Sequence, residues 1–341
     1  MFFLFSWIRE IFEWTPLDSN PVDCFLRGLV GACGVSVLYN LLRVYHFIQT
    51  CRDSEISGGE SEQKPSSPET PLRSSWRAAL QFWSLSFVLS VVGSRVSSLI
   101  VLEFLLRAVS AWMSAGLNAG VGSLDLLLIQ CQFSLGCSLL CTLAFLHQGA
   151  LHSSLSLLLA AGLGWVVASY SSSLWSHAAR LYALHSTERY CGRCIHLLTS
   201  GHTLLASLQR AVVLAFAVGT VASASTVYEH FLFHKDAIKF WTPLTLCYTM
   251  LVVFTQEAQQ KQAGMEKLLH TVVMRLGGLL VLMLTVGNWS DVLHVLVSFW
   301  GEAVCLLSSR DLLQAVLQVC LNHILPFAGY VSDCQSDSCV S

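Results

Sequence analysis

The stretch AALQFWSLSFVLSVVGSRVSSLIVL, residues 78–102, contains a single charged side chain, Arg95. An apolar run of roughly 18 or more residues is long enough to cross the hydrocarbon core of a bilayer as one helix. The whole chain of 341 residues is 54% hydrophobic and 12% charged, whereas a soluble domain carries about a quarter charged residues. The sequence therefore predicts an all-α protein, a polytopic helical membrane bundle.

Seven further apolar runs lie outward from residues 78–102, separated by polar or charged segments. We predict about eight transmembrane helices, at residues 25–48, 78–102, 124–146, 151–175, 204–228, 237–255, 268–288 and 292–307. The second of them is expected to continue as a helix through residues 103–112. The first span lies within residues 17–50, and the helical membrane bundle of the other seven occupies residues 78–310.

Both ends of the chain carry amphipathic patterns. In residues 1–16 the polar side chains recur at helical spacing and form one stripe, which is typical of a helix lying in the membrane interface. In residues 311–341, amide side chains recur every four positions from Gln314 to Asn322, which favours a surface helix followed by a polar tail. A ninth span is the alternative for this segment, because the chain carries no charge from Leu312 to Ser332.

The composition changes abruptly in residues 51–77. The segment CRDSEISGGESEQKPSSPETPLRSSWR lacks an apolar period and is rich in Ser, Glu, Pro and Gly. Such a composition buries too little apolar surface to offset the entropy lost when a chain becomes ordered. We therefore predict a disordered polar linker between the first and second spans.

Small residues at every fourth position indicate where helices approach one another closely. Two spans contain such rows: Ser86, Ser90, Ser94 and Ser98 in one, and Ala211, Ala215, Gly219 and Ser223 in the other. Because no water separates helices inside a membrane, small residues let their backbones pack together. We interpret both rows as packing seams, and a polar path lined by the serines is the alternative.

The polar loop predicted at residues 176–203 contains a Cys-x-x-Cys pair within the stretch HSTERYCGRC. Cys191, Cys194 and His196, with His185 as a fourth ligand, would be the donors of a zinc site. Structural zinc usually combines two such paired motifs, whereas this loop supplies one. We therefore favour a Cys/His/Arg loop at the level of the lipid headgroups, and we predict that it binds no metal or other cofactor.

Three other roles for this motif follow from its surroundings. Haem attachment requires a histidine directly after the second cysteine, where this chain has Ile195. A redox Cys-x-x-Cys normally opens a helix after a strand in a soluble fold, which does not match a helical membrane protein. Juxtamembrane cysteines are acceptors of palmitate, so Cys191 and Cys194 are the predicted lipidation sites.

Among the charged residues inside predicted spans, where a charge is costly, we single out Arg95, Arg275 and Glu302 as candidates for a role within the membrane. A tight turn near residues 289–290 joins the last two spans, which are therefore expected to be antiparallel neighbours. Counting about 1.5 Å per residue from that turn places Arg275 and Glu302 within about 3 Å of the same depth. We predict that they form an ion pair and that Arg95 lies in the same half of the membrane.

Glu103 and Arg107 lie four residues apart on the helix that continues the second span. A glutamate four residues before a basic residue is the favourable order for an ion pair on a helix surface. Counted along a straight helix, both residues pass the edge of the hydrocarbon core. We therefore predict an interfacial pair.

Three blocks, VVGSRVSSLIVLEFLLRAVS (91–110), RLYALHSTERYCGRC (180–194) and FWTPLTLCYTMLVV (240–253), together resemble the vertebrate transmembrane protein 82 family. The similarity extends over about residues 25–310 and fades in the linker and the C-terminal tail. The resemblance implies a multi-pass membrane protein. It implies no activity, and it carries no catalytic residue over to this chain.

The sequence contains no nucleotide-binding loop, paired catalytic carboxylates, nucleophile elbow or HExxH motif, so we expect a protein that is not an enzyme. Eight spans with charges inside them favour a transporter- or channel-like role for a small solute, ion or lipid. The alternative is a structural or partner-binding membrane protein. Its expected partners are the lipid bilayer and proteins that dock on the linker and the cytosolic loops, and no nucleic acid.

Overall fold

The computed structural model describes residues 20–56, 71–115, 121–148, 153–187, 191–229, 245 and 265–313. Within these ranges the regular elements are helices and no strand occurs, which confirms the all-α fold class. The predicted helix at residues 1–16, the predicted span at 237–255 apart from residue 245, and the segment after residue 313 lie outside the described residues.

The described helices are α2 (Pro21–Ile56), α3 (Pro71–Ala115), α4 (Val121–Gln130), α5 (Gln132–Leu146), α6 (Ser153–Thr187), α7 (Gly192–Val227), α9 (Met265–Val286) and α10 (Trp289–Ser308). Among them, α2, α3, α6, α7 and α10 contain stretches long and apolar enough to cross a membrane. Two shorter apolar helices, at Gln132–Leu146 and Leu269–Thr285, fall on two further predicted spans. The helices therefore match a multi-pass membrane bundle.

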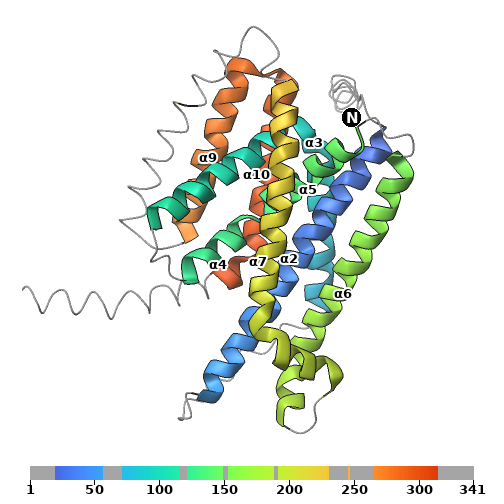
Figure 1. The fold of residues 1–341 in the computed structure, drawn as a ribbon, viewed down its shortest axis with the longest axis vertical. Helices are drawn as coiled ribbons and strands as arrows, with labels where there is room; N and C mark the ends of the chain where they lie inside the picture. The colour runs from blue at the N-terminus through green and yellow to red at the C-terminus, as the bar shows by residue number, and fades with distance from the viewer. Residues whose placement is uncertain are drawn as a thin grey trace, which may run out of the picture.

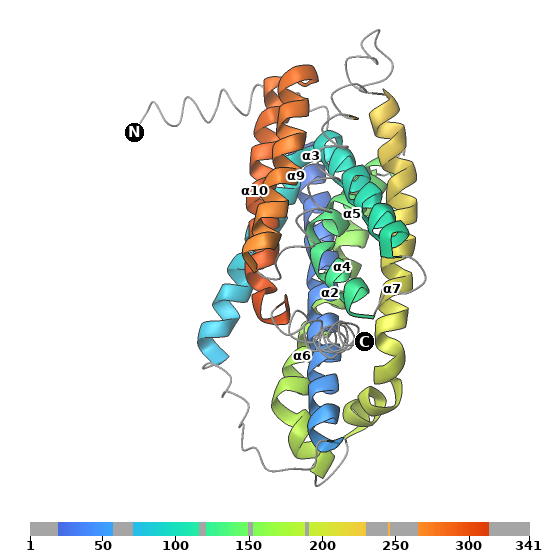
Figure 2. The ribbon, with the colours of Figure 1, turned by 90° about the vertical axis from the view of Figure 1, so that its left-hand side faces the viewer.

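The helices pack in an order that differs from their order in the sequence. Helix α2 packs against α3, α5 and α6, and α3 also packs against α5, α7 and α10. Figure 1 shows α2 and α6 running side by side, and Figure 2 shows α9 and α10 as an adjacent pair. The largest apolar cluster includes Leu38 of α2, Leu89 of α3, Phe133 of α5 and Leu276 of α9. Its members come from α2, α3, α4, α5, α7, α9 and α10, which therefore share one core, whereas α6 contributes to a second, smaller cluster.

Helix α3 changes direction at Gly93, which has φ +70° and ψ 169°. This conformation is accessible to glycine and strained for other residues, so Gly93 separates two helical halves. In Figure 2 the chain rises along the first half of α3 and descends along the second. The predicted continuation of the helix through residues 103–112 is confirmed, since α3 extends to Ala115. The kink at Gly93, which the sequence did not predict, returns these residues to the bundle.

A second departure from the sequence prediction lies in the span expected at residues 124–146. Helix α4 ends at Gln130 and α5 begins at Gln132, with Cys131 between them at φ −79° and ψ −5°. That ψ is far from the value of about −42° in a regular helix. The predicted third span is therefore divided into two shorter helices.

The predicted linker at residues 51–77 is shorter than its composition indicated. Helix α2 continues to Ile56, and α3 begins at Pro71, while residues 57–70 lie outside the described residues. Proline suits the first turn of a helix because its φ is already fixed near the helical value and its missing N–H is not needed there. Both helices therefore extend beyond the apolar runs that predicted them.

The serine row in α3 forms a packing seam with α2, as predicted. Ser86 and Ser98 are fully buried. A Cβ atom placed on Gly28 of α2 would lie 2.7 Å from the backbone nitrogen of Ser90 and 2.8 Å from the carbonyl oxygen of Ser86. The two backbones are therefore in contact, which small residues permit inside a membrane.

Candidate functional site

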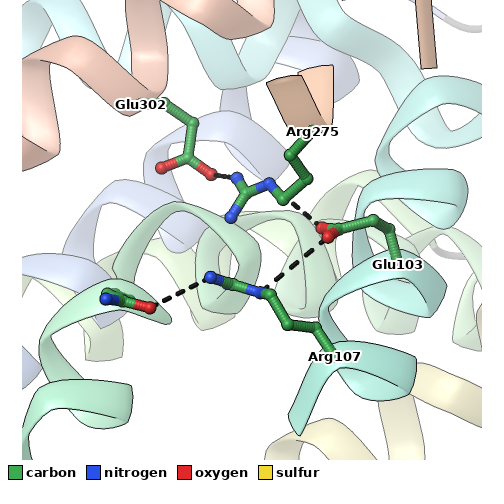
Figure 3. A network of polar contacts seen from close by, with 5 residues as sticks. Glu103, Arg107, Arg275 and Glu302 are labelled. Carbon is green, nitrogen blue, oxygen red and sulfur yellow. Dashed lines mark hydrogen bonds and ion pairs between the residues drawn. The ribbon is translucent and has the colours of Figure 1, made fainter. Parts of the chain in front are cut away.

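Arg275 of α9 occupies the centre of a buried group of charges. Its side chain is 1% exposed, and it contacts carboxylates from two other helices (Figure 3). Its Nη2 donates to Oε1 of Glu302 in α10, and its Nε lies 3.1 Å from Oε2 of Glu103 in α3. The contact between Arg275 and Glu302 is the one that depth counting predicted, whereas the contact with Glu103 was not predicted.

Arg107 extends this group toward α4. Its Nε lies 3.8 Å from Oε1 of Glu103, and its Nη1 donates a hydrogen bond of 3.0 Å to Oε1 of Gln130 (Figure 3). The predicted Glu103–Arg107 pair is present, but it differs from a pair on the surface of a helix, because Glu103 is 6% exposed and also ion-paired with the buried Arg275. The kink at Gly93 accounts for this difference, since it turns the second half of α3 inward.

We refer to Glu103, Arg107, Arg275 and Glu302 as the charge cluster. With both carboxylates and both guanidinium groups ionised, its net charge is zero. A buried charge without a partner of opposite sign costs several kcal/mol, so each member depends on the others. The second half of α3, α9 and α10 are therefore connected electrostatically at one level of the bundle.

Glu103 is incompletely satisfied despite its position between two arginines. Both of its carboxylate oxygens are buried, and neither accepts a well-aligned hydrogen bond from a described residue. Buried carboxylate oxygens in proteins normally accept such bonds. The cluster therefore retains acceptor capacity for a proton, a water molecule or an ion.

A small cavity lies beside the cluster. Its lining residues are Arg107, Gln130, Thr271, Val272, Arg275, Glu302 and Leu306. The cavity has about 10 Å³ of space for the centre of a water molecule, which is room for about one water. In this conformation it accommodates a water molecule or a small ion and is far too small for a lipid.

Arg95 belongs to a separate ion pair. Its Nη2 lies 3.2 Å from Oδ2 of Asp291, which also accepts a hydrogen bond of 3.2 Å from the backbone N–H of Asn288. Asp291 lies in the first turn of α10, eleven residues before Glu302, or about 16 Å along the helix axis. Arg95 therefore does not share the level of Arg275 and Glu302, contrary to the sequence prediction.

The Cys-x-x-Cys motif lies at a helix junction and not within an extended loop. Helix α6 continues to Thr187 and α7 begins at Gly192, so helices occupy most of the loop predicted at residues 176–203. Cys191 is the N-cap of α7, and its Sγ accepts from the backbone N–H of Cys194. The described part of this junction is therefore held by helix capping.

His177 of α6 completes a group of three donors with the two cysteines, a residue that sequence reasoning missed. Its Nε2 lies 3.3 Å from the Sγ atoms of both Cys191 and Cys194. His196, the predicted third ligand, is exposed. It follows Cys194 by two residues of helix, which is about 200° around the axis. His185 lies within α6, and its side chain is outside the described part of the chain.

The two cysteines differ in their surroundings. Cys194 is 2% exposed, and it packs among Val44, Ile48 and Ala178. Burial and the neighbouring Cys191 thiol raise the pKa of the Cys194 thiol to about 11. A protonated, buried thiol is a poor nucleophile, so of the two predicted lipidation sites Cys191 is the more accessible.

The match to a protein family includes both the charge cluster and the residues at the junction of α6 and α7. A family model described as transmembrane protein 82 matches residues 22–325 of the chain. The matched range includes the charge cluster and the group formed by His177, Cys191 and Cys194. No solved structure gives a significant match to the chain.

Proposed function

The chain belongs to the transmembrane protein 82 family and is a multi-pass membrane protein, and on this premise we propose that it moves protons or another small ion across its membrane. The observation that carries the proposal is the position of Arg275 between Glu103 and Glu302, where all three side chains are at most 6% exposed. Ionisable residues inside a membrane bundle are rare and generally mark ion or proton pathways.

Stability alone is a poor explanation for these charges. Replacing a buried ion pair by apolar residues of similar volume is often neutral or stabilising. The surrounding positions are occupied by apolar residues such as Phe133, Leu276 and Leu306, which pack helices without a desolvation cost. A cluster of four charged residues at this level therefore favours a role in handling charge.

Proton binding offers a simple way to alter the cluster. Protonation of Glu302 would remove its negative charge, while Arg275 would keep Glu103 as a partner. The cluster would then carry one net positive charge, and α10 would lose its ionic attachment to α9. Because Arg275 contacts carboxylates on two helices, a proton on either one shifts the balance between them. Arg275 would then pair mainly with Glu103 in one state and with Glu302 in the other. An ion pathway requires two such alternative states.

The dimensions of the site narrow the range of solutes. The cavity beside Arg275 has room for about one water molecule, and Glu103 has acceptor capacity to spare. A proton or a small ion fits these conditions, whereas a lipid or a metabolite does not fit this conformation. The proton is accordingly the first ion to test.

Proton flux in liposomes tests the proposal. The purified full-length chain is reconstituted with a pH-sensitive dye inside, and a potassium gradient with valinomycin supplies the driving potential. We expect internal pH to change faster than in protein-free liposomes, and more slowly for Glu302→Gln than for the wild type. A wild-type rate equal to that of protein-free liposomes, for protons and for small inorganic ions, would count against the proposal.

Close packing around the cluster favours a second function, that of a non-enzymatic structural or partner-binding membrane protein. A Cβ atom on Gly301, next to Glu302, would collide with the ring of the fully buried Phe133. In this alternative the charges fix the arrangement of α3, α9 and α10 and move nothing. Folded wild-type protein without flux, together with reproducible protein neighbours in proximity labelling, would support it.

A further inference from the structure

A second chemically distinctive group lies at the junction of α6 and α7, away from the charge cluster. We propose that His177, Cys191 and Cys194 bind a zinc ion that joins the end of α6 to the start of α7. This inference is independent of ion transport. The three side chains are the one group of potential metal ligands that the described part of the chain brings together.

The distances between the donor atoms suit a tetrahedral ion. His177 Nε2 lies 3.3 Å from each cysteine Sγ, and all three donor atoms lie within 4.8 Å of one another. Zinc binds sulfur at about 2.3 Å and nitrogen at about 2.0–2.1 Å, so tetrahedral angles require a separation of about 3.6 Å between S and N. For these two pairs of S and N atoms, binding would require movements of a few tenths of an ångström.

The helix start directs both sulfurs to one place. Cys191 has an extended conformation, φ −86° and ψ 160°, as the N-cap of α7, and Cys194 follows in the first turn. The backbone N–H of Cys194 points at Cys191 Sγ at 3.4 Å. N–H groups at a helix N-terminus stabilise negative charge. This end of α7 therefore places an N–H group against the sulfur of Cys191, while Cys194 would release its proton as the metal binds.

The junction is held by packing on several sides. Val44 and Ile48 of α2, Ala178 of α6 and Leu197 of α7 form a buried apolar cluster with Cys194. His177 directly precedes Ala178, so its backbone is fixed by the same contacts. Donors mounted on packed helices lose little freedom when they bind an ion, which favours affinity.

The donor types select the metal. Thiolate and imidazole ligands suit zinc, whereas magnesium and calcium prefer oxygen. Three protein ligands leave one tetrahedral position for water or for a further side chain. The sequence alone favoured a metal-free loop because it supplied one Cys-x-x-Cys pair. His177 of α6 adds a third donor to the two cysteines, and three donors in one place favour a metal site.

Elemental analysis tests the site directly. The full-length chain is produced in zinc-supplemented medium and purified in detergent without a chelating tag or metal resin. We expect about one zinc per chain in the wild type, and background amounts in His177→Ala and in the double variant Cys191→Ser/Cys194→Ser. His196→Ala is the matched control, since it alters a neighbouring exposed histidine and should retain the metal.

A spectroscopic measurement covers the case in which a variant loses its fold. Cobalt added to metal-depleted wild-type protein should give thiolate-to-cobalt charge-transfer absorption, and His177→Ala protein with a wild-type elution volume should not. Three results would overturn the proposal: wild-type zinc at the background level, zinc retained at the wild-type level by His177→Ala, or a disulfide between Cys191 and Cys194 in protein purified under reducing conditions.

Discussion

Arg275 Nε lies 3.1 Å from Glu103 Oε2, so residues from α9 and from the second half of α3 share a buried ion pair. The same arginine donates to Glu302 of α10. One guanidinium group therefore connects three helices, and its planar set of donors suits two carboxylates at once. Removing one member of this group leaves the others buried with unequal charge.

Replacement of Arg275 by methionine should therefore destabilise the protein strongly. Arg275→Met alone leaves two carboxylates facing Arg107, and breaking a buried ion pair in this way costs about 3–5 kcal/mol. The double variant Arg275→Met/Glu302→Gln leaves the Glu103–Arg107 pair with zero net charge. We expect the double variant to be more stable than Arg275→Met, as measured by thermal unfolding in detergent.

The melting temperatures of the single and double variants can also contradict the predicted contact. A double variant with a melting temperature as low as that of the worse single variant would mean that Arg275 and Glu302 do not interact. A charge swap is a less suitable test, because Arg275→Glu would bring a carboxylate against Glu103. Recovery by a swapped pair is therefore expected to be incomplete even if the contact exists.

Gly93→Ala tests the kink in α3. No side chain or backbone atom lies within 4 Å of the position where the added Cβ would be, so crowding is absent. The cost comes from the backbone, because φ +70° with ψ 169° is a region reserved for glycine, and strain there is worth about 1–3 kcal/mol. We expect a lower melting temperature for this variant.

Gly162→Ala is the matched control for the kink. It too adds a methyl group with no atom within 4 Å, but within the regular helix α6, where alanine is favoured over glycine. It should be neutral or slightly stabilising. Equal melting temperatures for Gly93→Ala and Gly162→Ala would contradict the kinked conformation.

Gly28→Ala should destabilise the contact between α2 and α3. The added Cβ would lie 2.7 Å from the backbone nitrogen of Ser90, and a backbone cannot move aside as a flexible side chain can. Overpacking of this kind typically costs about 1–3 kcal/mol. The melting temperature of Gly28→Ala in detergent measures the effect. Gly277→Ala is the control, because its added Cβ meets no atom within 4 Å. Equal melting temperatures for the two variants would show that α2 and α3 are not in close contact.

Asp291→Asn is expected to have a small effect. The Arg95 side chain is 33% exposed, and ion pairs that are partly exposed at a protein surface contribute about 0–1 kcal/mol. Asparagine also keeps an oxygen that can accept the hydrogen bond from the N–H of Asn288. The melting temperature and the proton flux of Asp291→Asn should both stay close to those of the wild type. A loss of proton flux in folded Asp291→Asn protein would place the ion pathway at the Arg95–Asp291 pair instead of at the charge cluster.

The sequence was sufficient for those parts of the fold that depend on local periodicity. Apolar runs located the five long described spans, and counting residues from the turn between α9 and α10 predicted the contact of Arg275 with Glu302. That count succeeded because two antiparallel helices joined by a short turn have a fixed register. Asp291 could also have been found, since Asn288-x-x-Asp291 before an apolar run is typical of a helix N-terminus.

The sequence was insufficient where tertiary structure determines the outcome. Gly93 is adjacent to Ser94 of the serine row, and nothing in its neighbourhood distinguishes a kink from a packing position. Without the kink, Glu103 was assigned to the membrane interface. His177 was missed for a related reason, because it approaches Cys191 and Cys194 from a different helix, fourteen and seventeen residues earlier in the chain.

The measurement that tests the account most directly is proton flux through the folded double variant Arg275→Met/Glu302→Gln, compared with wild type and with Asp291→Asn in the same liposomes. The double variant keeps a neutral cluster and should fold, but it lacks the exchangeable pair. We predict proton flux in the wild type and in Asp291→Asn, and flux at the level of protein-free liposomes in the double variant. Wild-type flux through the folded double variant would contradict the assignment of the charge cluster as the functional site.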